Sequence, residues 1–206
     1  MSDEWLQLIN EIKNCKKCPL SKYRRNPVPG EGPRDADIMI IGEAPGAKED
    51  EEGRPFVGAA GKLLTTLLES IGLKRDNVYI TNVVKCRPPN NRDPTEEEIN
   101  TCLPYLMKQI AIIKPKIIIA LGRHAARTIF KQAGLVWKNM STMHGKVYEG
   151  TINGHKVIII PTYHPAAALY KPNLKAILEK DFTVVIASVL RDKEKKRQRS
   201  LLDFLK

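Results

Sequence analysis

The stretch from Ile38 to Leu64 constrains the fold most strongly, because an apolar run in it leads through a glycine-rich loop into a helix. Four apolar residues precede Gly42, and a helical pattern begins at about Gly58. Such a run is typical of a buried parallel strand, and open α/β sheets bind ligands beyond the carboxyl ends of their strands. The loop carries one aromatic ring among carboxylates: Glu43, Glu49, Asp50 and Phe56. We therefore expect a binding site in this loop.

Neither of the common phosphate-binding motifs fits the loop. The G-x-G-x-x-G spacing of dinucleotide-binding turns does not occur in it, and the segment from Gly58 to Leu63 is too short for a P-loop. No Ser or Thr follows Lys62 to bind Mg²⁺. The sequence therefore disfavours a nucleoside triphosphate site.

The rest of the chain alternates short apolar strands with helices. Four segments have the pattern of strands, the last as the second arm of a hairpin that turns at Asn153-Gly154: 38–41, 78–84, 117–121 and 156–160. Five segments have a helical period: 3–14, 58–71, 95–113, 123–132 and 173–190. Because the strands are apolar on both faces, helices should cover both sides of the sheet. We predict a three-layer α/β/α sandwich with a mainly parallel four-stranded sheet.

Length, hydropathy and charge limit the class of protein. With 206 residues, 42% of them hydrophobic, the chain can bury the core of one domain, and no apolar run reaches the length of a membrane span. The acidic, amphipathic N-terminus does not resemble a signal peptide, so we expect a cytoplasmic monomer without a membrane partner. The net charge of +11 favours a polyanionic partner such as nucleic acid, whereas the alternative is a solvated, lysine-rich surface.

The chain contains four cysteines, spaced C-x2-C and then C-x15-C: Cys15, Cys18, Cys86 and Cys102. In a chain without a secretory signal, this number and spacing favour a metal site over disulfides. Zinc and a [4Fe–4S] cluster both accept four thiolates, and the spacing does not choose between them. A third possibility is that the thiols are simply buried. A metal here would tie the N-terminal helix to the loop that follows the second strand.

Chemically useful side chains follow successive strands. Glu43, Glu49 and Phe56 follow the first strand, Asn82 and Asn91 belong to or follow the second, and His164 follows the fourth. Each has an ordinary structural explanation when taken alone. Together, at one edge of a parallel sheet, an acid, an amide, an imidazole and an aromatic ring suit a planar heterocycle. His124 and His155 receive no role at this stage, and that of His144 stays open.

Two motifs then carry a resemblance to a known family. The segment Gly42-Glu43-Ala44-Pro45-Gly46, with Glu49-Asp50 and residues 53–58 after it, resembles the first motif of the family 4 (iron–sulfur) uracil-DNA glycosylases. The segment His164-Pro165-Ala166 resembles the second motif, and Asn82 and the four cysteines occupy the family's positions. The resemblance runs from Cys15 to about Leu190. It implies the uracil-DNA glycosylase fold and a [4Fe–4S] cluster on the cysteines.

The resemblance also implies an activity. Such an enzyme flips uracil out of DNA, hydrolyses its N-glycosidic bond and leaves an abasic site that starts base excision repair. Phe56 would stack on the base, Asn82 would bind its pairing edge, and His164 would stabilise the uracil anion. The backbone at Gly42, Glu43 and Ala44 would contact the carbonyl groups of uracil. Glu49 would crowd the C5 position and exclude the methyl group of thymine.

The sequence departs from the best-known uracil glycosylase motif, GQDPY, because the water-orienting aspartate of that motif falls opposite Ala44. Asn91 and Glu49 are our candidates for the water ligand. No KRRIH loop, through which a related group captures the sugar covalently, follows Cys86, so we expect turnover. We expect Leu169 to act as the wedge that fills the vacated base stack, the alternative being an ordinary helix cap.

The last residues form a separate tail. Residues 191–206 hold seven Lys or Arg against three acids, so 7 − 3 gives +4 of the net charge, and we divide the chain into a domain over 1–190 and a basic tail over 191–206. One polar and three apolar residues near its end resemble a sliding-clamp (PCNA) interaction box: Gln198, Leu201, Phe204 and Leu205. Leu205 replaces the usual second aromatic residue. The alternative is a frayed amphipathic terminus.

Two other functions compete with the enzyme. A non-catalytic, metal-stapled DNA-binding adaptor for a sliding clamp would bind DNA in a salt-sensitive way and release no base. An iron–sulfur electron carrier would show reversible redox chemistry without any need for Asn82.

Overall fold

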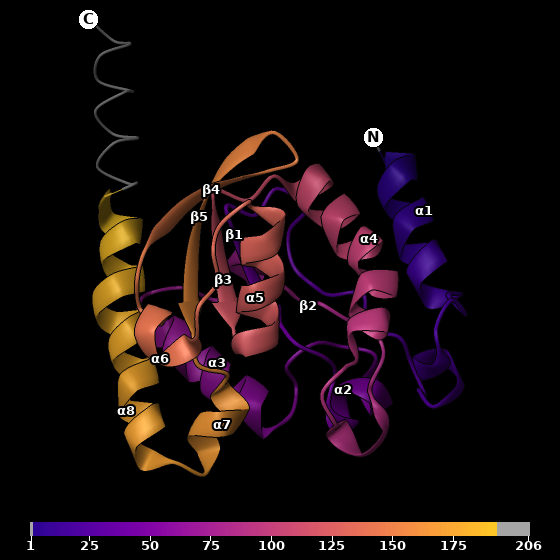
Figure 1. Ribbon diagram of the computed structural model, residues 1–206, viewed down its shortest axis with the longest axis horizontal. Coiled ribbons are helices and arrows are strands. Elements are labelled where there is room, and N and C mark those ends of the chain that lie inside the picture. Colours follow the sequence, from indigo (N-terminus) through magenta and orange to yellow (C-terminus); the bar gives the residue numbers. More distant parts are fainter. Residues whose placement is uncertain (1, 193–206) are drawn as a thin grey trace, which may run out of the picture.

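The computed structural model describes residues 2–192 of the chain and contains a central five-stranded sheet (Figure 1). Its strands are β1 (Ile38–Gly42), β2 (Tyr79–Asn82), β3 (Ile117–Leu121), β4 (Tyr148–Ile152) and β5 (His155–Thr162). They lie in the order β2-β1-β3-β5-β4, and every neighbouring pair is parallel except β4 with β5. The expected α/β/α class with a mainly parallel sheet is confirmed.

The predicted number of four strands is wrong. The first arm of the hairpin pairs antiparallel with β5 from Tyr148 opposite Ile159 to Ile152 opposite His155. It therefore extends the sheet by one edge strand, because an arm that pairs with a sheet strand becomes part of that sheet. Strand β2 is shorter than the expected 78–84, because it ends at Asn82. Beyond Asn82, the hydrogen bonding to the β1 side continues only through the amides of Val83 and Val84, which donate to the carbonyls of Gly42 and Glu43.

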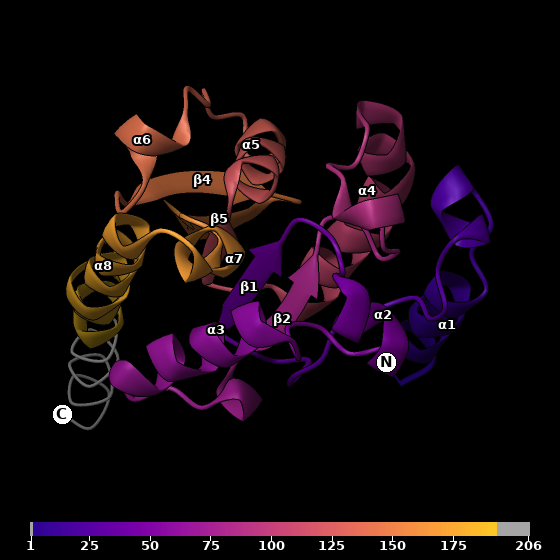
Figure 2. The ribbon, with the colours of Figure 1, turned by 90° about the horizontal axis from the view of Figure 1, so that it is seen from below.

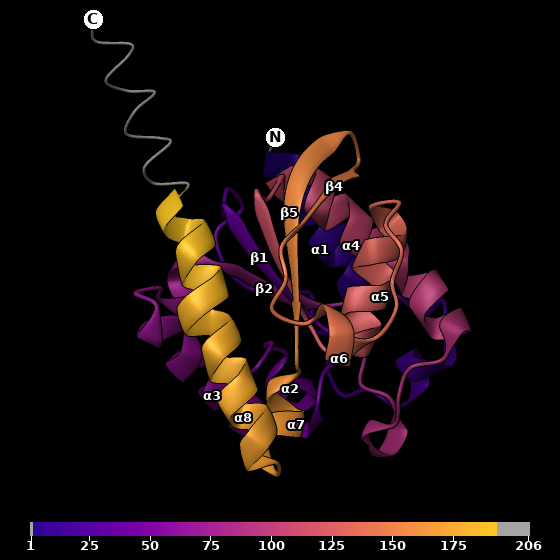
Figure 3. The same ribbon diagram turned by 60° about the vertical axis from the view of Figure 1, so that its left-hand side comes forward.

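Helices cover both faces of the sheet. Helices α1 (Ser2–Lys13), α4 (Glu96–Ile113) and α5 (Arg123–Gln132) lie on one side, and α3 (Ala59–Ser70) and α8 (Pro172–Lys180) lie on the other (Figures 2 and 3). The alternation of side chains along β1 explains the two layers. Met39 and Ile41 belong to the core beneath α4 and α5, whereas Ile38 and Ile40 belong to the core beneath α3 and α8.

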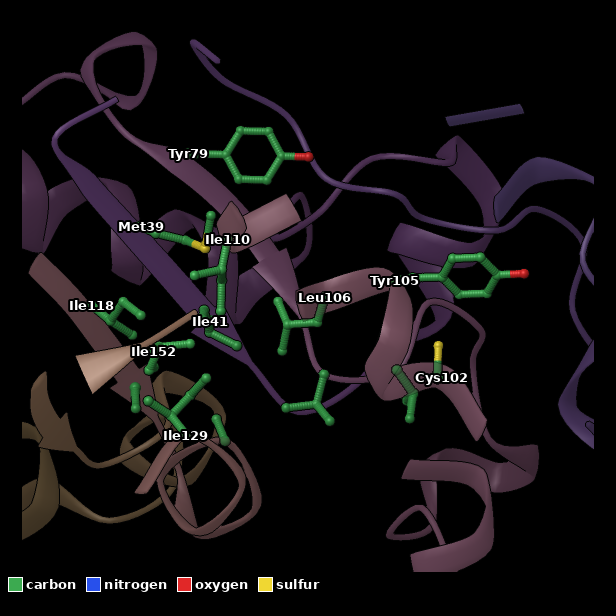
Figure 4. Packing of buried hydrophobic residues seen from close by; sticks show 14 of the residues in the cluster. Met39, Ile41, Tyr79, Cys102, Tyr105, Leu106, Ile110, Ile118, Ile129 and Ile152 are labelled. Atoms are coloured by element: carbon green, nitrogen blue, oxygen red, sulfur yellow. The ribbon is translucent and has the colours of Figure 1, made fainter. Parts of the chain in front are cut away.

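The larger core lies between β1 and the helix α4. Figure 4 shows Leu106 and Ile110 of α4 facing Met39 and Ile41 of β1. Cys102 lies at the edge of this same core, one helical turn before Leu106. The packing of α4 on the sheet therefore also sets the position of one of the four cysteines.

Three short helices occur where the sequence led us to expect loops or caps: α2 (Ala47–Glu52), α6 (Met140–Met143) and α7 (Pro165–Leu169). Gly46 caps the N-terminus of α2, and its amide donates to the Glu49 carboxylate at 3.1 Å. Helices α2 and α7 lie at the lower end of the sheet in Figure 1, where the parallel strands end. Both therefore help to build the rim of a site at that edge.

The remaining elements are single turns and the end of the described chain. Three 3₁₀ turns connect the larger elements: Pro19–Lys22, Arg75–Asn77 and Pro89–Asn91. The last helix was expected over 173–190; α8 starts at Pro172 and continues through a π-helical turn at Asp181–Ile186. The proposed clamp-binding box, residues 198–205, lies outside the described residues, and the domain boundary at 190 stays a prediction. Within residues 2–192, no helix combines the length and apolarity that a membrane span needs.

Candidate active site

A cavity of about 550 Å³ opens at the carboxyl ends of β1, β2, β3 and β5. Seven of the residues singled out in the sequence line it: Glu43, Ala44, Glu49, Phe56, Asn82, Asn91 and His164. Gly42 forms the end of β1 directly behind two of them. Leu169 is not part of the lining; it lies at the end of α7, 40% exposed, while Ala166 and Ala167 of the same helix line the cavity. The convergence expected from the strand ends is therefore present.

Phe56 and His164 provide two aromatic rings within the cavity. Their ring centroids are 5.6 Å apart with an interplanar angle of 28°. A base inserted between them would need two stacking distances of about 3.4 Å each, which is more than this separation allows. A planar ligand can therefore stack on the Phe56 ring with His164 at its edge, but it does not fit between the two rings as they stand.

Asn82 is buried at the end of β2 with an unused acceptor. The residue is 1% exposed, and its Oδ1 has no hydrogen-bond partner among the described residues. A buried polar atom without a partner is rare, because it loses its hydrogen bonds to water without replacement. A Cβ placed on Gly42 would lie 2.4 Å from this oxygen and 2.6 Å from the Phe56 ring, so the site needs a glycine there. The amide is therefore positioned for a ligand atom.

The imidazole of His164 is neutral and has a defined tautomer. Its Nδ1 accepts a hydrogen bond from the Ala166 amide at 3.1 Å, which assigns the proton to Nε2. Burial lowers the pKa of His164 to about 4, and the charge of Glu49 only partly opposes this shift. At neutral pH the ring is therefore an uncharged hydrogen-bond donor through Nε2.

The Glu49 carboxylate is bound on both oxygens by backbone amides. Oε1 accepts from the amides of Val57 and Gly58, both at 2.9 Å, and Oε2 accepts from Gly46. It therefore connects α2 to the segment that follows Phe56. The expected roles of Glu49 as water ligand and as a block at the C5 position stay predictions beside this structural one.

The side-chain oxygens of Asn91 and Glu43, which also line the cavity, differ in their hydrogen bonding. Asn91 has a left-handed backbone with φ 53°, and its Oδ1 accepts from Arg87 Nε at 2.7 Å, which leaves its amide NH₂ group for a ligand. The Glu43 carboxylate accepts no hydrogen bond within the described part of the chain. Burial raises the pKa of Glu43, although its neighbour His124, 4.0 Å away, partly opposes that shift.

The structure also places residues at the site for which the sequence predicted no role. His124 follows β3, only 15% of its side chain is exposed, and its Nε2 lies 3.4 Å from Asp93 and 4.0 Å from Glu43. Arg123 and Tyr163 line the cavity. The end of β3 could have been treated like the ends of the other strands, and this would have indicated Arg123 and His124.

His144, whose role the sequence left open, supports the site indirectly. Its Nδ1 lies 3.0 Å from an oxygen of Asp181, and its ring lies 5.0 Å from that of Tyr163. Asp181 also accepts from the Thr162 hydroxyl at 2.6 Å. His144 therefore links the π-helical turn to the end of β5.

The four cysteines line one small cavity next to α1 and α4: Cys15, Cys18, Cys86 and Cys102. All four are free thiols. Arg24 Nη1 donates to Cys86 Sγ at 2.9 Å, and the Lys85 amide donates to Cys102 Sγ at 3.2 Å. No three of these sulfurs lie within 4.8 Å of one another. A tetrahedral zinc ion, with Zn–S bonds of about 2.3 Å, would hold its sulfurs about 3.8 Å apart.

Buried Lys85 connects the cysteine cavity to the larger one. Its ammonium group donates to Thr81 Oγ1 at 2.6 Å, to the Asn82 carbonyl at 2.7 Å and to Gln109 Oε1 at 2.7 Å. Its own amide binds Cys102. The segment from Asn82 to Cys86 therefore joins the two sites through four consecutive peptide bonds and the hydrogen bonds of one buried amine, and burial lowers the pKa of this Lys85 amine to about 7.

Comparisons with known proteins give a consistent family. The profile of the uracil DNA glycosylase superfamily matches residues 29–188. The chain is 57% identical over 181 residues to a type-4 uracil-DNA glycosylase of Sulfurisphaera tokodaii; the aligned residues cover 87% of this chain and 82% of that protein. It is 50% identical over 198 residues to a type-4 uracil-DNA glycosylase of Archaeoglobus fulgidus, with 96% and 97% covered. A type-5 uracil-DNA glycosylase of Pyrobaculum aerophilum is 33% identical over 189 residues, with 77% and 80% covered.

Proposed function

The chain belongs to the uracil-DNA glycosylase superfamily, and we infer from this membership and from the cavity that it is a uracil-DNA glycosylase of the type-4 kind. It acts in base excision repair, with DNA as its partner. The observation that carries the inference is the unpaired Oδ1 of Asn82, buried beside an aromatic ring and a neutral imidazole.

We propose that Asn82 reads the pairing edge of a flipped-out base. Its Oδ1 accepts the N3–H of uracil, and its NH₂ group donates to O4. Cytosine offers an amino group in place of O4, and the donor and acceptor would then clash with the same amide. Phe56 stacks on the ring, and the base reaches it only after leaving the duplex, at a cost of a few kcal/mol.

His164 stabilises the charge that develops on the base. The C1′–N1 bond breaks with its electron pair staying on uracil, water adds its oxygen to C1′, and a proton from that water neutralises the products. The Nε2–H of neutral His164 donates to the uracil oxygen on which negative charge grows. Asn91 and Glu49 remain the proposed water ligands. The free NH₂ group of Asn91 supports the first, whereas the Glu49 carboxylate already accepts three backbone hydrogen bonds and is less available.

An oligonucleotide assay tests the activity. The purified chain is incubated with a labelled strand containing one uracil, abasic sites are cleaved with alkali, and the products are separated on a gel. We expect a cut at uracil and none at thymine in the matched strand. His164→Ala should lose most of the cut, while His155→Ala, which changes the exposed first residue of β5, should keep it. DNA binding without any cut would favour the adaptor.

We propose that the four cysteines hold a [4Fe–4S] cluster. Two observations support it: the sulfurs surround a common cavity more widely than zinc requires, and Arg24 and the Lys85 amide donate to two of them. When bound, such a cluster supplies four iron–thiolate bonds that fasten α1 and α4 to the loop after β2. Iron and sulfide analysis of the purified protein should give about four of each per chain. Zinc in place of iron would contradict the proposal.

Two further contacts remain proposals about partners. Leu169 is exposed at the end of α7, two residues beyond the cavity-lining Ala167, and would enter the vacated base stack. The tail would bind a sliding clamp through Gln198, Leu201, Phe204 and Leu205. Removing residues 198–206 should abolish co-elution with the clamp and leave uracil release from a short oligonucleotide unchanged; unchanged co-elution would refute the box.

A further inference from the structure

Phe56 has a backbone conformation that an aromatic residue rarely adopts. Its φ is 51°, in the left-handed region where the Cβ of a bulky residue is crowded. Such a conformation persists only where its surroundings impose it. The groups that bind the backbone on either side of Phe56 therefore decide where its ring lies.

One negatively charged and one positively charged side chain bind the backbone around Phe56. On the amide side, the Glu49 carboxylate accepts from Val57 and Gly58 at 2.9 Å each. On the carbonyl side, the guanidinium of Arg75 donates to the carbonyl oxygens of Pro55 at 2.7 Å and Phe56 at 3.0 Å. The carboxylate fits the amides and the guanidinium fits the carbonyls, so each charge binds the backbone groups that it can satisfy.

The Phe56 carbonyl is also confined by the neighbouring helix. A Cβ placed on Gly61 of α3 would lie 1.8 Å from the Phe56 carbonyl oxygen. The helix backbone therefore approaches this carbonyl without an intervening side chain. Arg75 is the donor that satisfies the carbonyl in this confined place.

Arg75 is itself fixed by Glu31. Its Nη2 lies 2.6 Å from Glu31 Oε1, and only 19% of its side chain is exposed. The second oxygen of Glu31 binds Arg54 Nε at 2.9 Å, and Arg54 is 60% exposed. Burial raises the pKa of Glu31, but the hydrogen bonds from Arg54 and Arg75 outweigh this effect and lower it overall. Glu31 therefore stays charged at neutral pH and holds Arg75 in place.

We propose that Arg75 is a positioning residue for base recognition: it holds the carbonyls of Pro55 and Phe56 so that the Phe56 ring lies where a flipped base can stack. Arg75 does not line the cavity, so its role would be exerted through the backbone of Pro55 and Phe56. The proposal deepens the function proposed above and rests on it. A planar guanidinium suits the task, since it binds two carbonyls and a carboxylate at once.

The variant Arg75→Gln tests this under single-turnover conditions, with excess enzyme and a uracil-containing strand. We expect the rate constant for base release to fall about 10- to 100-fold, as expected when a reacting group is misplaced by about 1 Å. The enzyme concentration for half-maximal rate, which reflects DNA binding, should change little. Inhibition by free uracil, which reports stacking without DNA, should weaken by a similar factor to the rate.

Arg54→Gln is the matched control, because Arg54 binds the same Glu31 but no carbonyl of this loop. It should leave the rate and the uracil inhibition at wild-type values. Arg75→Lys keeps the charge opposite Glu31 but cannot bridge both carbonyls, so its rate should fall between wild type and Arg75→Gln. Equal rates for Arg75→Gln and Arg54→Gln, below the melting temperature of both, would overturn the positioning role. An inactive wild type would instead refute the proposed function.

Discussion

Asn82 and Lys85 lie three residues apart, and both residues are only 1% exposed, yet their polar side-chain atoms differ in hydrogen bonding. The Lys85 ammonium has three hydrogen-bond acceptors within 2.7 Å. The Asn82 Oδ1 has no donor among the described residues. The satisfied group ties segments of the fold together, whereas the unsatisfied one faces a cavity large enough for a base. Burial alone thus does not distinguish a structural polar residue from a functional one. The difference lies in whether its polar atoms have hydrogen-bond partners within the protein.

The largest expected effect comes from removing the unsatisfied group. Asn82→Ala should lower kcat/KM for uracil release about 10²- to 10³-fold, the size expected when a site loses a hydrogen bond that acts on the substrate. The melting temperature should stay the same or rise slightly, because the free protein loses an unpaired buried oxygen. Calorimetry and single-turnover kinetics measure the two quantities. A clear fall in melting temperature with unchanged kinetics would show that Asn82 stabilises the fold and does not bind the base.

Removing the satisfied group should have the opposite pattern. Lys85→Met leaves Thr81, the Asn82 carbonyl and Gln109 without their common donor, which should cost about 3 kcal/mol of stability. For a domain of this size that corresponds to a fall in melting temperature of about 6–12 °C. The exposed Lys156 provides a control, since Lys156→Met should leave the melting temperature unchanged. Unchanged stability in the Lys85 variant would show that its bonds are not a structural tie.

His164 stands between these two cases, because one ring nitrogen is satisfied and the other is available. Burial lowers its pKa in the folded chain to about 4, below the ordinary histidine value of 6.5. Between these values the unfolded chain binds a proton that the folded chain does not, so stability falls as the pH drops from 6.5 to about 4. Base release by the neutral ring should stay constant from about pH 8 to 5 and decline below about pH 4.

A pH–rate profile under single-turnover conditions checks this prediction. His164→Gln keeps a neutral donor and should remove the decline near pH 4 while lowering the plateau. A decline already centred near pH 6.5 in the wild type would mean that the ring is not shielded from water in the enzyme at work.

The same contrast explains what the sequence could and could not predict. Asn82 and His164 could be predicted because each apolar run in the sequence shows where a strand ends. The carboxyl ends of parallel strands lie at the same edge of the sheet. The partners of buried groups could not be found in this way, since they are distant in the chain: Glu31 binds Arg75 across 44 residues, and Arg24 binds Cys86 across 62. Helix α2 was missed for a related reason, because the Glu49 carboxylate that caps it also binds Val57 and Gly58 in the next loop.

The smallest expected effect tests an exposed residue, which neither ties the fold nor binds the base. Leu169 is 40% exposed at the end of α7, so Leu169→Ala should leave the melting temperature unchanged. As a wedge, it would act only where a neighbouring stack must be filled, and filling that stack compensates for a few kcal/mol of unstacking. We therefore expect a fall in rate of about three- to tenfold on double-stranded uracil DNA and almost none on a single strand, where extrusion costs least. Leu6→Ala, which changes a leucine that is 64% exposed on α1, is the matched control and should change neither rate. Equal losses on both substrates would mean that Leu169 supports α7, and through it His164, rather than the DNA.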